Sequence, residues 1–179
     1  MRCLARRGVL PQESCKICGM EAQVQLDAID RRILRALQID GRITYDALGA
    51  QVSLSASAVL RRVRRLEEAG AIAAYVALVP PERVGLGLTA YLNVRLEKQP
   101  ESHKRNPMDL FRAAVQTWPE VVECVALTGE MDYLLRVVVQ DMAHYARFIA
   151  ETLLKHPSVQ DCKTSFVLDR VKNTTAVPV

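Results

Sequence analysis

The sequence predicts an α+β protein of two domains: an N-terminal winged helix-turn-helix domain and a C-terminal ferredoxin-like domain with β-α-β-β-α-β order. Two observations support this prediction. Between residues 26 and 70, apolar side chains recur at helical spacing behind three separate capping residues. After residue 87, strand-like segments, the first of which alternates cleanly, are interleaved with helical ones. A chain of 179 residues is long enough for two small domains.

The overall composition is that of an ordinary soluble globular protein, with half of the residues hydrophobic and a quarter charged. The net charge of +4 is too small to establish a nucleic-acid partner by itself. The apolar stretches are interrupted too often to span a membrane, so no membrane partner is expected. Cys124 and Cys162 fall in strand-like segments rather than in a disulfide framework. We therefore expect a cytoplasmic protein.

Residues 1–24 form an N-terminal extension that we expect to be disordered, because it has no sustained hydrophobic period and is a poor secretion signal. Cys15 and Cys18 form a C-x-x-C pair, but a structural zinc site needs four ligands. Cys3 offers a third ligand, and no nearby histidine offers a fourth. A redox pair would need a strand-to-helix setting that is missing here. We expect no metal site, and Met20 is a second candidate for the start of translation.

Residues 25–74 carry three helical segments that together predict a helix-turn-helix domain. Each segment opens on a residue that caps helix N-termini well: Asp27, Thr44 and Ser55. Asp30 follows Asp27 by three residues, in an arrangement similar to a capping box. The third segment, "LSASAVLRRVRRLEEAG", is expected to run to about residue 69 and to end at Gly70.

Four arginines crowd into five positions of this third helix: Arg61, Arg62, Arg64 and Arg65. With Val59 at the centre of the inward face, Val63 and Leu66 fall within about 40° of it. The opposite face carries small residues, then arginines and one acid: Ser57, Ala58, Arg61, Arg64, Arg65 and Glu68, with Arg62 on its flank. Small residues let a helix enter the major groove, where arginine reaches base edges or phosphates. A merely solvated face would mix acids among the arginines, so we predict double-stranded DNA as a partner.

A short strand and a hinge are predicted over residues 72–86, with residues 75–86 as the linker between the domains. The stretch "AIAAYVALVPPERVG" has a strand-like beginning. It runs into Pro80 and Pro81, which continue neither a helix nor a central strand.

Residues 87–179 contain the segments of the second domain. Four of them are strand-like: "LTAYLNVRLE", "VVECVALT", "YLLRVVV" and "VQDCKTSFVL". Two carry helical stripes: "MDLFRAAVQTW" and "DMAHYARFIAETLLKH". Such a sheet has one face that is covered by helices and one open face. The strand faces that point toward the open side also hold Val, Leu and Tyr. A second copy of the chain can cover them, so we expect a homodimer.

The chain resembles the Lrp/AsnC, or feast/famine, transcription regulators over residues 26–179. The resemblance rests on "LDAIDRRIL", "SLSASAVLRRVRRLEEAGAI", "TGEMDYLLRV" and "VKNTTAVPV", which agree in order and spacing. It implies a sequence-specific DNA-binding regulator with a helix-turn-helix, a hinge, and a C-terminal ligand-binding and dimerisation domain. It also implies dimers that assemble into tetramers or octamers, with an amino acid as effector and no other cofactor.

The resemblance also assigns candidate site residues. DNA contacts are expected in the recognition helix, and the small face of that helix adds Ala58 to them: Ser55, Ser57, Ala58, Arg61, Arg62 and Arg65. Ala56 stands where the family often has proline, which costs some pre-organisation of the first turn. The family's effector loop has the form Gly-x-x-Asp-Tyr and matches five consecutive residues: Gly129, Glu130, Met131, Asp132 and Tyr133. The glycine lets backbone approach a ligand closely, and Asp132 is a candidate partner for an ammonium group.

Two other functions stay open at this point. Some proteins of the same two-domain build are enzymes that decarboxylate tetrapyrroles of the sirohaem type, which requires His or Arg groups gathered in the sheet cavity. The histidines here, His103, His144 and His156, lie in a loop, on a helix and at a helix end. No nucleophile motif is present, so we expect no enzyme and no catalytic residues. The other alternative is a DNA-free amino-acid sensor, against which the arginine face argues.

Overall fold

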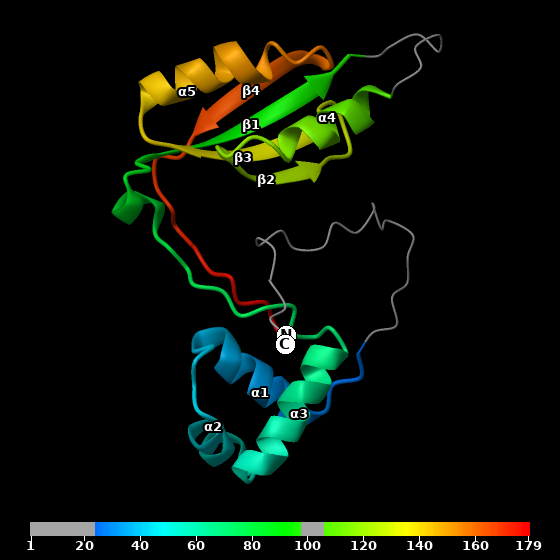
Figure 1. Ribbon diagram of the computed structural model, residues 1–179, viewed down its shortest axis with the longest axis vertical. Helices are drawn as coiled ribbons and strands as arrows, with labels where there is room; N and C mark the ends of the chain where they lie inside the picture. The colour runs from blue at the N-terminus through cyan, green and yellow to red at the C-terminus, as the bar shows by residue number, and fades with distance from the viewer. Residues whose placement is uncertain (1–23, 98–105) are drawn as a thin grey trace, which may run out of the picture. The chain divides into compact units, whose positions relative to one another are not determined.

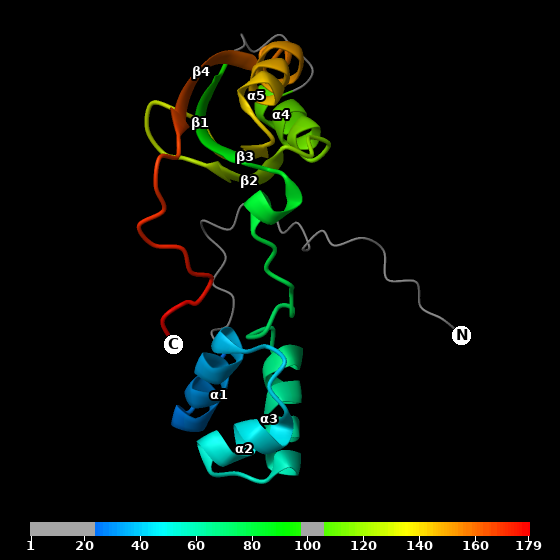
Figure 2. The same cartoon turned by 90° about the vertical axis from the view of Figure 1, so that its left-hand side faces the viewer.

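The computed structural model describes residues 24–97 and 106–179 and divides them into two compact units (Figures 1 and 2). The first unit holds the described residues up to 76 together with residues 175–179, and the second holds residues 77–174. The predictions for residues 1–23, including those for Cys15 and Cys18, lie outside the described residues. No helix in the two described ranges is long and apolar enough to cross a membrane.

The first unit contains the three predicted helices: α1 (Ala28–Ile39), α2 (Tyr45–Val52) and α3 (Ala56–Glu68). The predicted caps are confirmed, because the side chains of Asp27, Thr44 and Ser55 each accept a backbone N–H from the first turn that follows. The inward stripes of the three helices meet in one apolar core: Ile33, Leu34, Leu48, Val52, Val59, Val63 and Leu66. Burial of these stripes stabilises helices that are too short to be stable alone.

The turn between α2 and α3 is tight and depends on a glycine in α2. Ser53 adopts a left-handed conformation with φ of 62°, and the N–H of Leu54 donates to the carbonyl of Gly49 at 3.0 Å. A Cβ at Gly49 would lie 2.5 Å from the carbonyl oxygen of Leu54. Only glycine therefore lets the turn fold back onto α2 and bring α3 into place.

The short strand predicted at the start of residues 72–86 is absent, whereas the predicted break at Pro80 and Pro81 is present. The structure has no strand among the described residues 24–87, and the linker contains only a short 3-10 helix, η1 (Pro81–Val84). The extended stretch before it has no neighbouring strand in the first unit, so its backbone has no ladder partner. The first unit is thus a three-helix domain.

The second unit has the predicted β-α-β-β-α-β order of a ferredoxin-like fold. Its elements are β1 (Leu88–Leu96), α4 (Pro107–Val115), β2 (Val121–Ala126), β3 (Tyr133–Val139), α5 (Met142–Phe148) with a π-helical turn η2 (Ile149–Leu153), and β4 (Val159–Phe166). The strands pair antiparallel in the order β2-β3-β1-β4. This order places the first and third strands at the centre of the sheet.

The sheet has one covered face and one open face, as predicted. The helices α4 and α5 both lie on the same side of it (Figure 2). The core beneath them includes buried side chains from both central strands, both helices and η2: Leu92, Val94, Phe111, Leu135, Val137, Val139, Phe148 and Leu153. The other face mixes half-exposed apolar residues, such as Tyr91 and Val125, with an ion pair of 3.3 Å between Arg136 and Glu123.

Candidate nucleic-acid interface and ligand pocket

The outward face of α3 forms a shallow basic depression with a volume of about 530 Å³. Its lining residues include every predicted DNA contact except Ser55 and Ala58: Ser57, Leu60, Arg61, Arg62, Arg64, Arg65 and Glu68. The hydroxyl of Ser55 caps the helix by accepting the N–H of Ala58 at 3.3 Å, and lies 3.2 Å from the hydroxyl of Ser57. Ser57 and Arg61 are exposed on this face, whereas Ala58 is half-buried.

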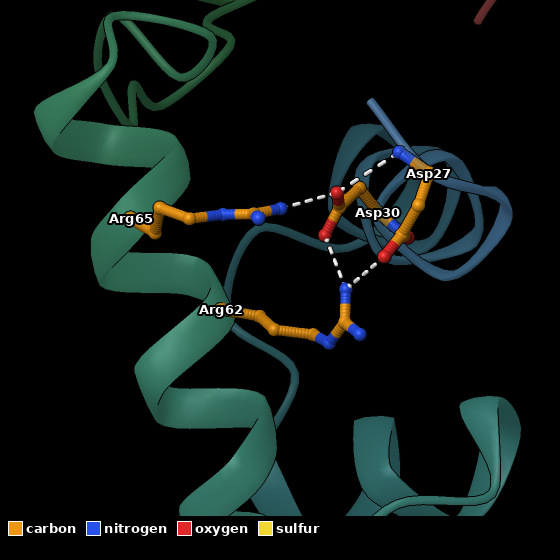
Figure 3. A network of polar contacts seen from close by, with 4 residues as sticks. All are labelled: Asp27, Asp30, Arg62 and Arg65. Carbon is orange, nitrogen blue, oxygen red and sulfur yellow. Dashed lines mark hydrogen bonds and ion pairs between the residues drawn. The ribbon is translucent and has the colours of Figure 1, made fainter. Parts of the chain in front are cut away.

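Two of the four arginines are tied to α1 (Figure 3). One guanidinium nitrogen of Arg62 lies 2.5 Å from a carboxylate oxygen of Asp27 and 2.9 Å from a carboxylate oxygen of Asp30. Arg65 pairs with the other carboxylate oxygen of Asp30. Asp30 is fully buried, so the two arginines provide the compensation that a buried carboxylate needs.

The same two aspartates also form the capping box of α1, which confirms the predicted arrangement. The N–H of Asp30 donates to Asp27 at 2.7 Å, and the N–H of Asp27 donates to Asp30 at 3.1 Å. The hydrogen bond from Arg62, followed by that from the N–H of Asp30, lowers the pKa of Asp27 from 3.8 to about 2. Asp27, and then Asp30, raise the pKa of Arg62. The pair of Asp27 and Arg62 therefore stays ionised at neutral pH.

The predicted DNA-contact arginines thus divide into two groups. Arg62 and Arg65 are engaged by acids of α1, whereas within residues 24–97 and 106–179 neither Arg61 nor Arg64 has an ion pair or hydrogen-bond partner for its side chain. The sequence alone does not reveal this division, because the partners are more than thirty residues apart. The capping box was visible in the sequence, but its link to α3 was not.

The second unit carries a pocket of about 830 Å³ at one end of its sheet. It is formed by the end of β1, the start of α4, the loop between β2 and β3, and the start of β4: Arg95, Leu96, Glu97, Asn106, Pro107, Met108, Gly129, Glu130, Asp132 and Gln160. Three of the five predicted effector residues, Gly129, Glu130 and Asp132, therefore line a pocket.

Side chains and backbone of β1 hold the loop between β2 and β3 in place. Arg95 donates from Nε to the carbonyl of Glu130 at 3.2 Å and lies 3.9 Å from the sulfur of Met131. The carboxylate of Asp132 accepts the N–H of Leu96 at 2.7 Å. Gly129 has φ of 121°, a conformation that favours glycine. Arg95 was not among the predicted site residues, although it is a cation on the open face of a predicted strand.

Tyr133 does not line this pocket. Its side chain is buried in the core, with its ring centroid 5.0 Å from that of Phe111. Its hydroxyl accepts a hydrogen bond from Nε of Arg112 at 3.0 Å. Burial raises the pKa of Tyr133, so its hydroxyl stays protonated at neutral pH. Tyr133 therefore supports the loop from the core side.

Two further titratable groups of the second unit, Cys124 and His156, are partly buried. Burial raises the pKa of the Cys124 thiol to about 11, which leaves it a poor nucleophile at neutral pH. His156 packs edge-to-face against Phe111 and Trp118, and burial lowers its pKa. Within the described ranges, no three His, Cys, Asp or Glu side chains gather where they could hold a metal ion.

A three-helix unit with a basic recognition helix, joined to a ferredoxin-like unit with a loop-lined pocket, defines a two-domain DNA-binding regulator. Comparison with known families agrees with this class. Residues 26–67 match the AsnC-type helix-turn-helix domain, and residues 89–177 match the Lrp/AsnC ligand binding domain. The chain belongs to the Lrp/AsnC family of transcriptional regulators.

Individual relatives cover nearly all of the described chain. The Bkd operon transcriptional regulator of Pseudomonas aeruginosa is 40% identical over 155 residues, which span 87% of this chain and 99% of that protein. The leucine-responsive regulatory protein of Escherichia coli K12 is 38% identical, over 86% of this chain and 92% of that protein. The solved complex of the regulator NMB0573 of Neisseria meningitidis with L-Met is 45% identical, with a TM-score of 0.81 over 86% of this chain and 97% of that one.

Proposed function

We propose that the chain regulates transcription by reading duplex DNA with Ser57 and Arg61 and that an amino acid in the second-unit pocket alters this binding. The exposed face of α3 carries the DNA part of the proposal. It begins with small residues that permit close approach to a major groove, and Arg61 then projects without a partner among the described residues. Arginine in that position makes the commonest specific contact, with guanine.

The pocket supports an amino acid with an apolar or sulfur-containing side chain as effector. Arg95 supplies a cation for the ligand carboxylate, and Glu130 and Asp132 supply acceptors for its ammonium group. Leu96, Pro107 and Met108 provide apolar surface for the side chain. The L-Met complex of the Neisseria relative and the name of the leucine-responsive relatives favour the same ligand class.

The open face of the sheet supports a homodimer, with further assembly to tetramers or octamers. Tyr91, Val125 and Leu127 are 37, 39 and 40% exposed on or beside this face. A second sheet packed on these residues would remove their apolar surface from water. In such an assembly, a ligand at the loop between β2 and β3 can alter how the copies pack, provided that it has different affinities for the two arrangements.

Fluorescence anisotropy tests the proposal directly. A duplex selected from a random pool by the protein itself would be titrated with the full chain, with and without each of the twenty amino acids. We expect one apolar or sulfur-containing amino acid to change the DNA affinity by about 5- to 150-fold. Arg61→Ala should weaken DNA binding by about 1–3 kcal/mol and relax the preference at one base position. Unchanged DNA binding by Arg61→Ala would contradict this reading face.

A further inference from the structure

The four arginines of α3 are expected to favour DNA binding that does not depend on sequence. Four cations in five positions would attract any phosphate backbone, and binding of that kind carries no sequence information. The structure shows that two of them, Arg62 and Arg65, are paired with Asp30, whereas Arg61 and Arg64 have no such partner within the described residues. The four arginines of α3 therefore fall into two groups, one paired with an acid of α1 and one without such a partner among the described residues.

The carboxylate of Asp30 is fully used. One oxygen accepts from Arg62 at 2.9 Å, and the other accepts from Arg65 and from the N–H of Asp27 at 3.1 Å. Asp30 itself is 0% exposed, whereas the side chains of Arg62 and Arg65 are 26% and 54% exposed. An arginine that left Asp30 for a phosphate would uncover part of a buried charge. Binding to DNA through these two arginines is therefore opposed by the fold.

The two ion pairs also fix the rotation of α3 about its own axis. Val59, Val63 and Leu66 bury one face of the helix, but apolar contacts have little directional preference. Arg62 and Arg65 are one turn apart on the flank of that face, and both reach the same carboxylate on α1 (Figure 3). A rotation of α3 about its axis would disturb both pairs together, because both arginines contact the same carboxylate. The same setting directs Ser57, Arg61 and Arg64 outward.

From these contacts we infer that Asp30 is a positioning residue for DNA recognition. It withholds Arg62 and Arg65 from non-specific phosphate binding and fixes the orientation from which Arg61 meets the bases. This inference rests on the proposed reading face. It gives the α1 capping box a second role, since the acids that cap α1 also orient α3.

The decisive experiment compares Asp30→Asn with the unaltered full chain, with Asp46→Asn as the matched control. Asn has the size of Asp, and its one amide oxygen can still accept the N–H of Asp27 in the capping box. Asp46 is an exposed acid in the first turn of α2, so the control makes the same charge change away from the network. Affinity would be measured on the selected duplex and on a scrambled one over a range of salt concentrations, after circular dichroism has verified the fold.

We expect Asp30→Asn to lower the ratio of specific to non-specific affinity by about tenfold or more, within the range set by a mismatched base pair. Binding to the scrambled duplex should strengthen and become more salt-dependent. The slope of log K against log salt should steepen by about 0.9 for each released arginine that reaches a phosphate. A role in stability alone would weaken binding to both duplexes equally and leave the ratio unchanged, which would overturn the inference.

Arg65→Gln tests the same inference without removing the buried acid, and so remains informative if Asp30→Asn does not fold. The inference expects an unchanged salt slope, because Arg65 does not contact phosphate. A slope reduced by about one would show that Arg65 binds DNA directly and would overturn it. Arg61→Ala distinguishes this inference from the proposed function. If Arg61→Ala weakens DNA binding and Arg65→Gln also reduces the salt slope, the proposed reading face is supported. The positioning role of Asp30 is then contradicted.

Discussion

Protonation of the Asp27 carboxylate is expected to lower the stability of the first unit in acid. Arg62 and the N–H of Asp30 lower its pKa from 3.8 to about 2. A depressed pKa stabilises the fold at pH values above the unfolded pKa, and this stabilisation is lost as pH falls toward 2. We expect the melting temperature to fall between pH 4 and pH 2, and to fall less steeply in Asp27→Asn, which retains a capping side chain. Parallel curves for the two proteins in melts at stepped pH would show that Asp27 makes no such contribution.

Asp132 lines the pocket and also holds the loop between β2 and β3 against β1. Its carboxylate accepts the N–H of Leu96, and its own N–H donates to the carbonyl of Val94 at 2.9 Å. Asp132→Ala should therefore cost about 1 kcal/mol of stability and weaken amino-acid binding, as measured by thermal melts and calorimetry. Asp132→Asn keeps an acceptor for Leu96 but loses the charge, so it should melt nearly normally and still bind the ligand more weakly. Full affinity in both variants would place the ligand elsewhere.

At the scale of elements, the turn between α2 and α3 limits what the helix-turn-helix tolerates. Gly49→Ala would place a Cβ 2.5 Å from the carbonyl oxygen of Leu54. The turn must then shift, at a cost of about 1–3 kcal/mol, and DNA affinity should fall with it. Gly41→Ala is the matched control, because its nearest neighbour is a side-chain atom of Tyr75 at 3.4 Å. Chemical denaturation would measure both, and equal stability would show that the turn adapts without strain.

The elements that the sequence predicted are those with a strong local pattern. The helices of the first unit follow from capping residues and apolar stripes, and β1 follows from strict alternation. Contacts between distant residues leave no such pattern, so the pairing of Asp30 with α3 and the loop contacts of Arg95 emerge only from the structure. The prediction of a strand after α3 was wrong for a related reason. A segment with strand-like composition forms a strand only where a neighbouring strand pairs with it.

At the scale of the whole molecule, the C-terminal residues 175–179 belong to the first unit, although the rest of the second half of the chain forms the second unit. Gln38 of α1 exchanges two hydrogen bonds with the backbone of Val177, at 2.6 and 3.1 Å. Nε of Arg35 donates to the carbonyl of Val179 at 2.7 Å, and Val179 packs against the apolar core of the three helices. The sequence gives no sign of this docking, because the partners are 139 or more residues apart.

Deleting residues 175–179 should therefore destabilise the three-helix unit by about 1–3 kcal/mol, from the lost hydrogen bonds and the exposed apolar surface. Hydrogen exchange would detect the change as reduced protection in α1, with the second unit unaffected. Gln38→Ala should reproduce only the part due to Val177, and Gln51→Ala on α2 is the control. Unchanged protection in the truncated protein would show that the segment contributes nothing to the fold.

In the proposed homodimer, the copies of the chain pack together through the open face of the sheet. Stable interfaces bury roughly 800 Å² on each partner, and a charge placed in such a contact is costly because it loses its water without gaining a partner. We expect Tyr91→Glu, at the centre of the open face, to weaken self-association at least tenfold in sedimentation velocity. Leu154→Glu is the control, because Leu154 is 52% exposed and follows η2 beyond α5. Dissociation by Leu154→Glu but not by Tyr91→Glu would move the interface off the open face.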